Sequence, residues 1–295
     1  MREIELHRQT DRALQEAKQV AELARKQADQ ANAAKSRYIS AISHELRTPL
    51  NSILGYAQLM GQDAGIPPHR KQAVSVILRG GEHLLSLMEG TLEMAQIESG
   101  KLVLSPKPLQ FEAAMSDMAA MFELQAEEKG LSFSYEVIGS LPDWVKADDK
   151  RVRQICFNLL GNAIKFTQTG GVTLRVRYAR EMAHIEIVDT GPGMTAAEIE
   201  RVYEPFVRGA AQGAGGSGLG LTIAKMLTDL MGGEMQVTSV PGQGSVFAVR
   251  LFLPQLHLPP EGANKLDAER QRRAERSGYA GPRRKILVVL SLIHI

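Results

Sequence analysis

Residues 39–60 read ISAISHELRTPLNSILGYAQLM and place their apolar side chains on one helical face. The apolar positions recur at gaps of three or four residues: Ile42, Leu46, Leu50, Ile53, Ala57 and Met60. This spacing predicts an amphipathic helix that packs against other helices. Two consecutive gaps of four, from Ile42 to Leu50, add one residue to the heptad repeat, and such an insertion locally unwinds a supercoil.

The helix is expected to extend toward the N-terminus, because residues 8–35 contain neither proline nor glycine and consist mainly of helix formers. Apolar and alanine positions continue there at alternating gaps of three and four, which predicts a coiled-coil signalling helix over residues 1–37. Alanine side chains bury little apolar area, so this coil would be weak and easily shifted. A single solvated helix remains the alternative.

A segment with glycine and proline, residues 61–68, ends this helix, and a second amphipathic stretch follows at about residues 70–98. Two helices joined by a short turn predict an antiparallel hairpin, which we place at residues 38–104. One hairpin cannot cover its own apolar face. We therefore expect a homodimer in which two hairpins form a four-helix bundle.

Residues 104–108 contain two prolines and predict a hinge into a second domain, residues 105–254. Segments with helical and strand periodicity alternate along that domain. We expect helices near residues 111–129, 148–167, 196–202 and 220–231, and strands near residues 131–138, 172–178, 184–189, 235–239 and 245–253. The fold class is therefore α+β, a helical hairpin followed by a two-layer α/β sandwich.

The composition narrows the function classes. The chain has 295 residues, and its 35 basic and 33 acidic residues leave a formal net charge of +2. This net charge is too small to indicate a protein that binds nucleic acid or a membrane surface. We therefore expect this chain to contact neither of them. No apolar run reaches the roughly 20 residues that a membrane helix needs. A single cysteine, Cys156, excludes an internal disulfide framework and suits a reducing compartment.

Residues 43–50, SHELRTPL, gather three polar groups on the first helix. His44 lies two positions beyond Ile42, so its ring is expected to face solvent, with Glu45 adjacent and Thr48 one turn further on. A neutral imidazole accepts a phosphoryl group near neutral pH, and a carboxylate that takes its other proton raises its nucleophilicity. Thr48 can position a water for the reverse hydrolysis. A histidine–glutamate pair taken alone is more often a solvated surface pair.

A stripe of polar residues lies on the helix expected at residues 148–167. Asn158 and Asn162 are four residues apart, and Lys165 follows three residues later, on the same face. The amide oxygen of Asn162 suits Mg²⁺, which prefers oxygen ligands, and Lys165 can meet phosphate charge. An exposed polar face is the alternative, although asparagine is a poor residue for a helix interior.

Residues 187–194, IVDTGPGM, end a predicted strand in an acidic residue followed by spaced glycines. The Asp189 carboxylate can accept a hydrogen bond from an adenine amino group. Gly191 and Gly193 let the backbone approach the base. An ordinary turn at the end of a strand would look similar.

Residues 209–220 are rich in glycine and lead into a predicted helix. Backbone N–H groups at a helix start bind phosphate, and the preceding run can close as a lid. The candidate phosphate-binding positions are Gly216, Gly218, Leu219 and Gly220. A flexible linker would have a similar composition.

Phe206 and Arg208 precede this run. Phe206 is expected to pack under the lid, and Arg208 to reach the γ-phosphate and stabilise charge during transfer. In isolation, each would be interpreted as structural, the phenylalanine in a core and the arginine on a surface.

The segment SHELRTPL closely resembles the H-box of the histidine kinase family. The segments around Asn162, Asp189, Phe206 and Gly218 resemble, in this order, the N, G1, F and G2 boxes of the GHKL ATP-binding fold that these kinases share. This resemblance implies autophosphorylation of His44, with Glu45 as the base and Thr48 assisting the phosphatase reaction. It also implies Mg²⁺ near Asn162, adenine on Asp189, and ATP phosphates at Lys165, Arg208 and the Gly218 region.

The same resemblance implies a cytoplasmic protein, alone or as part of a longer sensor, that passes its phosphate to an aspartate of a response-regulator receiver domain. Residues 255–284 predict a linker, and residues 285–295 resemble the start of a receiver domain, which suggests a hybrid kinase truncated there. Two other function classes stay open. One is a GHKL-type ATPase that modifies no histidine, and the other is a non-catalytic signalling dimer.

Overall fold

The computed structural model describes residues 45–63, 65–207 and 218–257, together with isolated helical positions between residues 15 and 43. The chain divides into the units Met1–Gln255 and Leu256–Ile295, and all helices and strands described below belong to the first. Most of the predicted coiled coil and linker, and all of the receiver-like end, lie outside the described residues. No helix in the described ranges is both long and apolar enough to span a bilayer.

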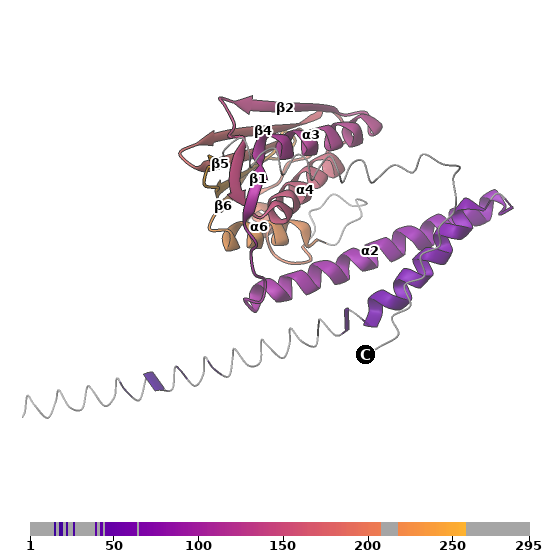
Figure 1. Cartoon of the computed structure of the whole chain (residues 1–295). Helices are drawn as coiled ribbons and strands as arrows, with labels where there is room; N and C mark the ends of the chain where they lie inside the picture. The colour runs from indigo at the N-terminus through magenta and orange to yellow at the C-terminus, as the bar shows by residue number, and fades with distance from the viewer. Residues whose placement is uncertain are drawn as a thin grey trace, which may run out of the picture. The chain divides into compact units, whose positions relative to one another are not determined.

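The N-terminal part forms the expected antiparallel hairpin (Figure 1). Residues 45–62 are helical, and α2 spans Pro68–Glu98. Pro68 begins α2. Backbone N–H groups in the first turn of a helix make no helical hydrogen bond, so a proline at this position removes none. The antiparallel direction follows from the ion pair between Arg47 and Glu89, 3.7 Å apart, because Arg47 lies near the N-terminal end of the described helix 45–62 and Glu89 lies in the C-terminal third of α2.

Close packing holds the two hairpin helices together. Leu50, Leu54 and Met88 form a small buried cluster. Gly81 makes room for it, since a Cβ at this position would lie 2.5 Å from the Leu54 side chain.

The second part contains a five-stranded sheet in the order β2-β4-β5-β7-β6 (Figure 1). The strands are β2 (Ser132–Ile138), β4 (Gly171–Ala179), β5 (Met182–Asp189), β6 (Glu234–Val240) and β7 (Gly244–Phe252). The β2 and β4 strands run parallel, and the other neighbouring pairs are antiparallel.

Helices cover one face of this sheet. They are α3 (Phe111–Glu128), α4 (Asp149–Phe166) and α6 (Gly220–Leu230), while α5 (Ala196–Arg201) is short. Alternate residues of β5 are buried, as period-two patterning requires for a sheet with one covered face. The largest fully buried side chains of this core are Phe111, Met115, Met118, Ile155, Leu159, Leu160, Leu174, Ile185, Ile187, Leu219, Leu227 and Leu251. The α/β sandwich expected from the sequence is confirmed.

A second, two-stranded sheet was not predicted. It pairs β1 (Lys107–Gln110) with β3 (Trp144–Ala147) in antiparallel register. The sequence indicated a hinge at residues 104–108, but Lys107 and Pro108 lie in β1. Proline is tolerated in a short edge strand, which explains why a proline-based signal missed it.

Candidate functional site

The predicted polar stripe lies on α4. Asn158, Asn162 and Lys165 are all partly buried there. A Cβ at Gly220 would lie 3.4 Å from Asn158 Oδ1, so Asn158 packs against the first residue of α6. Asn158 of the stripe therefore lies beside a helix N-terminus, whose unpaired N–H groups favour anions.

The C-terminal end of α4 is held by a residue that the sequence did not single out. The Lys129 ammonium donates hydrogen bonds to the carbonyl oxygens of Ile164 at 2.6 Å, Lys165 at 2.8 Å and Thr167 at 2.8 Å. A cation at a helix C-terminus satisfies carbonyl groups that have no helical partner. Lys129 thus fixes the backbone that carries Lys165. A lone lysine after a helix gives no sequence signal for this role.

Asp189 ends β5 and is only 7% exposed. Its Oδ1 atom accepts a hydrogen bond of 2.8 Å from the Gly191 N–H. Burial raises the pKa of the Asp189 carboxyl, and hydrogen bonds from the backbone of Gly191 and Ser245 act in the opposite direction. A buried carboxylate that is fixed by the backbone is a well-oriented acceptor for a ligand's amino group.

The glycines after Asp189 are required because neighbouring atoms leave no room for a side chain at either position. A Cβ at Gly191 would lie 2.8 Å from Asp189 Oδ1, and a Cβ at Gly193 would lie 2.0 Å from the Val240 carbonyl oxygen. Gly193 also has a φ of 66°, a conformation that other residues rarely adopt. Gly191 and Gly193 therefore leave no room for a side chain in the 189–194 turn, which lies close to the Asp189 side chain at one glycine and to the Val240 backbone at the other.

The described ends of the glycine-rich run meet each other. The Phe206 N–H donates to the Gly218 carbonyl oxygen at 3.1 Å, and both residues have positive φ, 63° and 70°. Leu219 is fully buried in the core, and Gly220 begins α6. The Phe206 side chain is 54% exposed, and the lid under which the sequence predicts it to pack lies outside the described residues. Arg208 and Gly216, with the rest of residues 208–217, lie outside the described residues.

The candidate acceptor His44 also lies outside the described residues. Its neighbours Glu45 and Thr48 are helical and exposed. The Thr48 carbonyl oxygen accepts a hydrogen bond from Ser52 Oγ at 3.2 Å.

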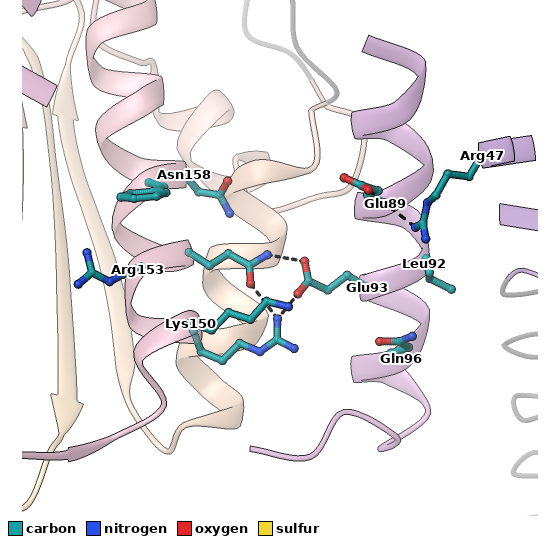
Figure 2. Close-up of a pocket in the computed structure, with 11 residues that line it drawn as sticks. Arg47, Glu89, Leu92, Glu93, Gln96, Lys150, Arg153 and Asn158 are labelled. Carbon is teal, nitrogen blue, oxygen red and sulfur yellow. Dashed lines mark hydrogen bonds and ion pairs between the residues drawn. The ribbon is translucent and has the colours of Figure 1, made fainter. Parts of the chain in front are cut away.

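A pocket of about 660 Å³ lies between α2 and α4 (Figure 2). Asn158 lines it from α4, Glu89 and Glu93 from α2, and Arg47 from the first hairpin helix. Figure 2 shows the Glu93 carboxylate extending from α2 toward α4, where Arg151 and Gln154 donate hydrogen bonds to it.

Besides the polar contact of Glu93 with α4, α2 makes an apolar contact with the start of α6. A Cβ at Gly90 of α2 would lie 2.9 Å from the Leu219 side chain, so the absence of a side chain at Gly90 permits the contact with α6. Nothing in the sequence singled out Glu89 and Glu93 of α2, because charged positions on a helix look like a solvated face.

Both parts of the chain match known families. Residues 34–100 match the His Kinase A (phospho-acceptor) domain, and residues 147–255 match the histidine kinase-, DNA gyrase B- and HSP90-like ATPase family.

Similar curated proteins align with the phospho-acceptor part and the ATPase-type part in one continuous match. The chain is 36% identical over 247 residues to the autoinducer 2 sensor kinase/phosphatase LuxQ of Vibrio parahaemolyticus, a match that covers 80% of this chain and 28% of LuxQ. It is 36% identical over 233 residues to the aerobic respiration control sensor protein ArcB of Escherichia coli, covering 77% and 30%. The chain therefore spans less than a third of these curated relatives.

Among solved structures, full-length ShkA in complex with AMPPNP superimposes with a TM-score of 0.66 at 33% identity. The match covers 76% of this chain and 47% of ShkA. Because the phospho-acceptor hairpin and the ATPase-type sandwich are matched in the same order, the chain belongs to the sensor histidine kinase family.

Proposed function

We propose that this chain is an ATP-dependent protein-histidine kinase of a two-component phosphorelay. ATP binds in the sandwich, its γ-phosphate passes to His44, and the phosphate then passes to an aspartate of a response-regulator receiver domain. The observation that carries the proposal is the pocket that is lined both by Asn158 of α4 and by Arg47, three residues after His44 (Figure 2). Phosphoryl transfer depends mainly on positioning, so a space shared by both parts supports it.

The residues of the sandwich fit ATP. Asp189 accepts a hydrogen bond from the adenine amino group, and the tight turn at Gly191 and Gly193 brings backbone close to the base. Lys165 and Arg208 meet the charge of the phosphates. The backbone N–H groups that begin α6 bind phosphate oxygens, as at other helix N-termini.

The chemistry of α4 also fits Mg²⁺. Asn162 is partly exposed, and its side-chain amide makes no hydrogen bond with the described residues, so its oxygen is available as a ligand. Mg²⁺ is commonly held by few protein oxygens together with phosphates and waters. When bound, the ion neutralises charge on the phosphates during transfer.

The acceptor chemistry needs a ring nitrogen and a base. One nitrogen of the His44 imidazole attacks the γ-phosphorus, the bond from phosphorus to the bridging oxygen breaks, and that oxygen leaves with ADP. Glu45 takes the proton from the other ring nitrogen. The exposed Thr48 supports a phosphatase reaction on the partner's phosphoaspartate, because its hydroxyl can position a water.

The hairpin is proposed to form a homodimer in the cytoplasm. Its first helix exposes large apolar side chains on one face: Leu46 at 49%, Ile53 at 54%, Tyr56 at 71%, Leu59 at 62% and Met60 at 48%. Such a face is costly in water, and a second copy of the hairpin would cover it.

Incubation with γ-labelled ATP and Mg²⁺ tests the proposal. The wild-type chain is expected to acquire an acid-labile phosphate, and His44→Gln is expected to acquire none. His69→Gln serves as the matched control, since His69 is an exposed histidine of the same hairpin. Label retained by His44→Gln would refute the assignment. ATP hydrolysis without any protein label would favour the ATPase alternative, and absence of nucleotide binding would favour the non-catalytic dimer.

A further inference from the structure

Arg47 of the first hairpin helix is poorly satisfied by its neighbours. Its ion pair with Glu89 joins Nη2 and Oε1 at 3.7 Å, which is too long for a hydrogen bond. Its Nε atom is covered by protein but makes no hydrogen bond to any described residue. A guanidinium carries five N–H donors, and a buried donor without a partner is destabilising. Arg47 therefore has hydrogen-bonding capacity that an anionic ligand would fill.

Arg47 lines the pocket between α2 and α4, where positive groups outnumber negative ones (Figure 2). The lining cations are Arg47, Lys150, Arg151 and Arg153, and the lining anions are Glu89 and Glu93. Arg151 already holds the Glu93 carboxylate. Arg153 lies 2.7 Å from the carboxylate of Asp149. Arg47, with its long ion pair, is thus left to attract an anion that enters this space.

The position of Arg47 along the chain relates it to the candidate acceptor. His44 precedes Arg47 by three positions, and residues 42, 43 and 45–62 are helical. Side chains three residues apart on a helix share a face, with Cβ atoms roughly 5–6 Å apart. An arginine side chain is long enough to bridge such a gap and reach a phosphoryl group on the histidine. Both residues belong to the same chain segment, so this relation holds whichever subunit supplies the nucleotide.

We propose that Arg47 is a catalytic residue that binds the transferred phosphoryl group. This role rests on the proposed kinase function and deepens it by naming a phosphate ligand close to the acceptor. The bond from the His44 nitrogen to the γ-phosphorus forms as the bond to the bridging oxygen of ADP breaks, and the non-bridging oxygens keep their negative charge throughout. Arg47 donates N–H groups to these oxygens and transfers no proton. Arginine suits this role, because its planar fork matches phosphate oxygens and stays charged.

Autophosphorylation kinetics with γ-labelled ATP and Mg²⁺ test the role of Arg47 in the full chain. Arg47→Ala is expected to lower the maximal rate of His44 labelling by about 100-fold, as loss of one transition-state donor does in other enzymes. Its ATP dissociation constant, measured by titration calorimetry, should stay within about twofold of wild type, because the proposed ground-state contacts of ATP lie in the sandwich. Arg47→Lys should label at an intermediate rate, since lysine keeps the charge but loses the fork.

Arg79→Ala is the matched control, because Arg79 is an exposed arginine of α2, and this variant should label at the wild-type rate. Chemical rescue separates catalysis from a structural role. Guanidinium ions at low millimolar concentration should restore part of the rate of Arg47→Ala and should leave the rate of Arg79→Ala unchanged. If Arg47 served only as the partner of Glu89, Glu89→Gln would lose as much rate as Arg47→Ala, and added guanidinium would rescue neither.

Full-rate labelling of Arg47→Ala, an equal rate loss in Glu89→Gln, or a rate loss explained by weaker ATP binding would each overturn the inference. Failure of the kinase proposal would look different. A wild-type chain that acquires no label on His44 would refute that proposal and this role with it. Labelling of His44 in wild type and in Arg47→Ala at the same rate would refute the role of Arg47 alone.

Discussion

The Glu93 carboxylate of α2 and the Arg151 guanidinium of α4 form an ion pair whose side chains are only 16% and 14% exposed. The partners are 58 residues apart in the sequence, and Gln154 donates to the same carboxylate. This pair joins the phospho-acceptor hairpin to the ATPase-type sandwich (Figure 2). Because both charges are largely shielded from water, removal of one leaves the other poorly solvated.

We expect Glu93→Ala to lower the free energy of unfolding by about 1–3 kcal/mol, below the range for a fully buried pair. Urea denaturation measures this difference. The double variant Glu93→Ala/Arg151→Ala should be less destabilised than the sum of the two single variants, because the unpaired charge is then absent. Glu89→Ala is the control, since its pair with Arg47 is long and exposed and should contribute no more than about 1 kcal/mol. Equal losses at both glutamates would contradict the expectation.

Lys129→Met should loosen the end of α4. The substitution removes hydrogen bonds to the carbonyl oxygens of Ile164, Lys165 and Thr167 while keeping most of the side chain's length. The expected loss of stability is about 1.5–3 kcal/mol, the range for hydrogen bonds that involve a charged group. ATP affinity should fall as well, because Lys165 is no longer held in place. Lys146→Met, at an exposed position of β3, should change neither the denaturation midpoint nor the ATP dissociation constant.

Gly193→Ala should disrupt the turn after Asp189. The new Cβ would meet the Val240 carbonyl oxygen at 2.0 Å, and the φ of 66° disfavours alanine. Strain and clash together should cost more than about 2 kcal/mol, measured by thermal or urea denaturation. Gly130→Ala isolates the conformational part, since Gly130 has a φ of 76° and a Cβ added there would meet no atom within 4 Å. That control should cost only about 1–2 kcal/mol, and a similar cost at both sites would argue against the clash.

Asp189→Asn should separate stability from binding. Burial raises the pKa of Asp189, so the folded protein holds this proton more tightly than the unfolded chain does. The Asp189 carboxyl therefore contributes favourably to the free energy of unfolding at low pH, below its pKa in the unfolded chain. This contribution is lost as the pH rises through its pKa in the folded protein. The asparagine variant should be more stable than wild type near neutral pH, and this advantage should shrink in acid. Denaturation midpoints across the pH range test the sign, and calorimetry should show weaker ATP binding by the same variant.

The secondary structure of the sandwich followed closely from its sequence. Alternating burial in β5 matches its period-two pattern, and α4 ends within one residue of the range expected at 148–167. These elements are predictable because each has a covered face that imposes a regular apolar spacing. β1 and β3 were missed, because four-residue strands are too short to show a period and one of them contains proline.

The sequence by itself determined the order of the motifs, the helical hairpin and the residue types needed at Asp189, Gly191 and Gly193. Only the tertiary structure decided that Lys129 holds the end of α4 and that Glu93 pairs with Arg151. The physical reason is the range of the interactions. Motifs and periodicity reflect constraints between neighbouring residues, whereas these contacts join distant segments that meet only when helices and sheet pack into one core.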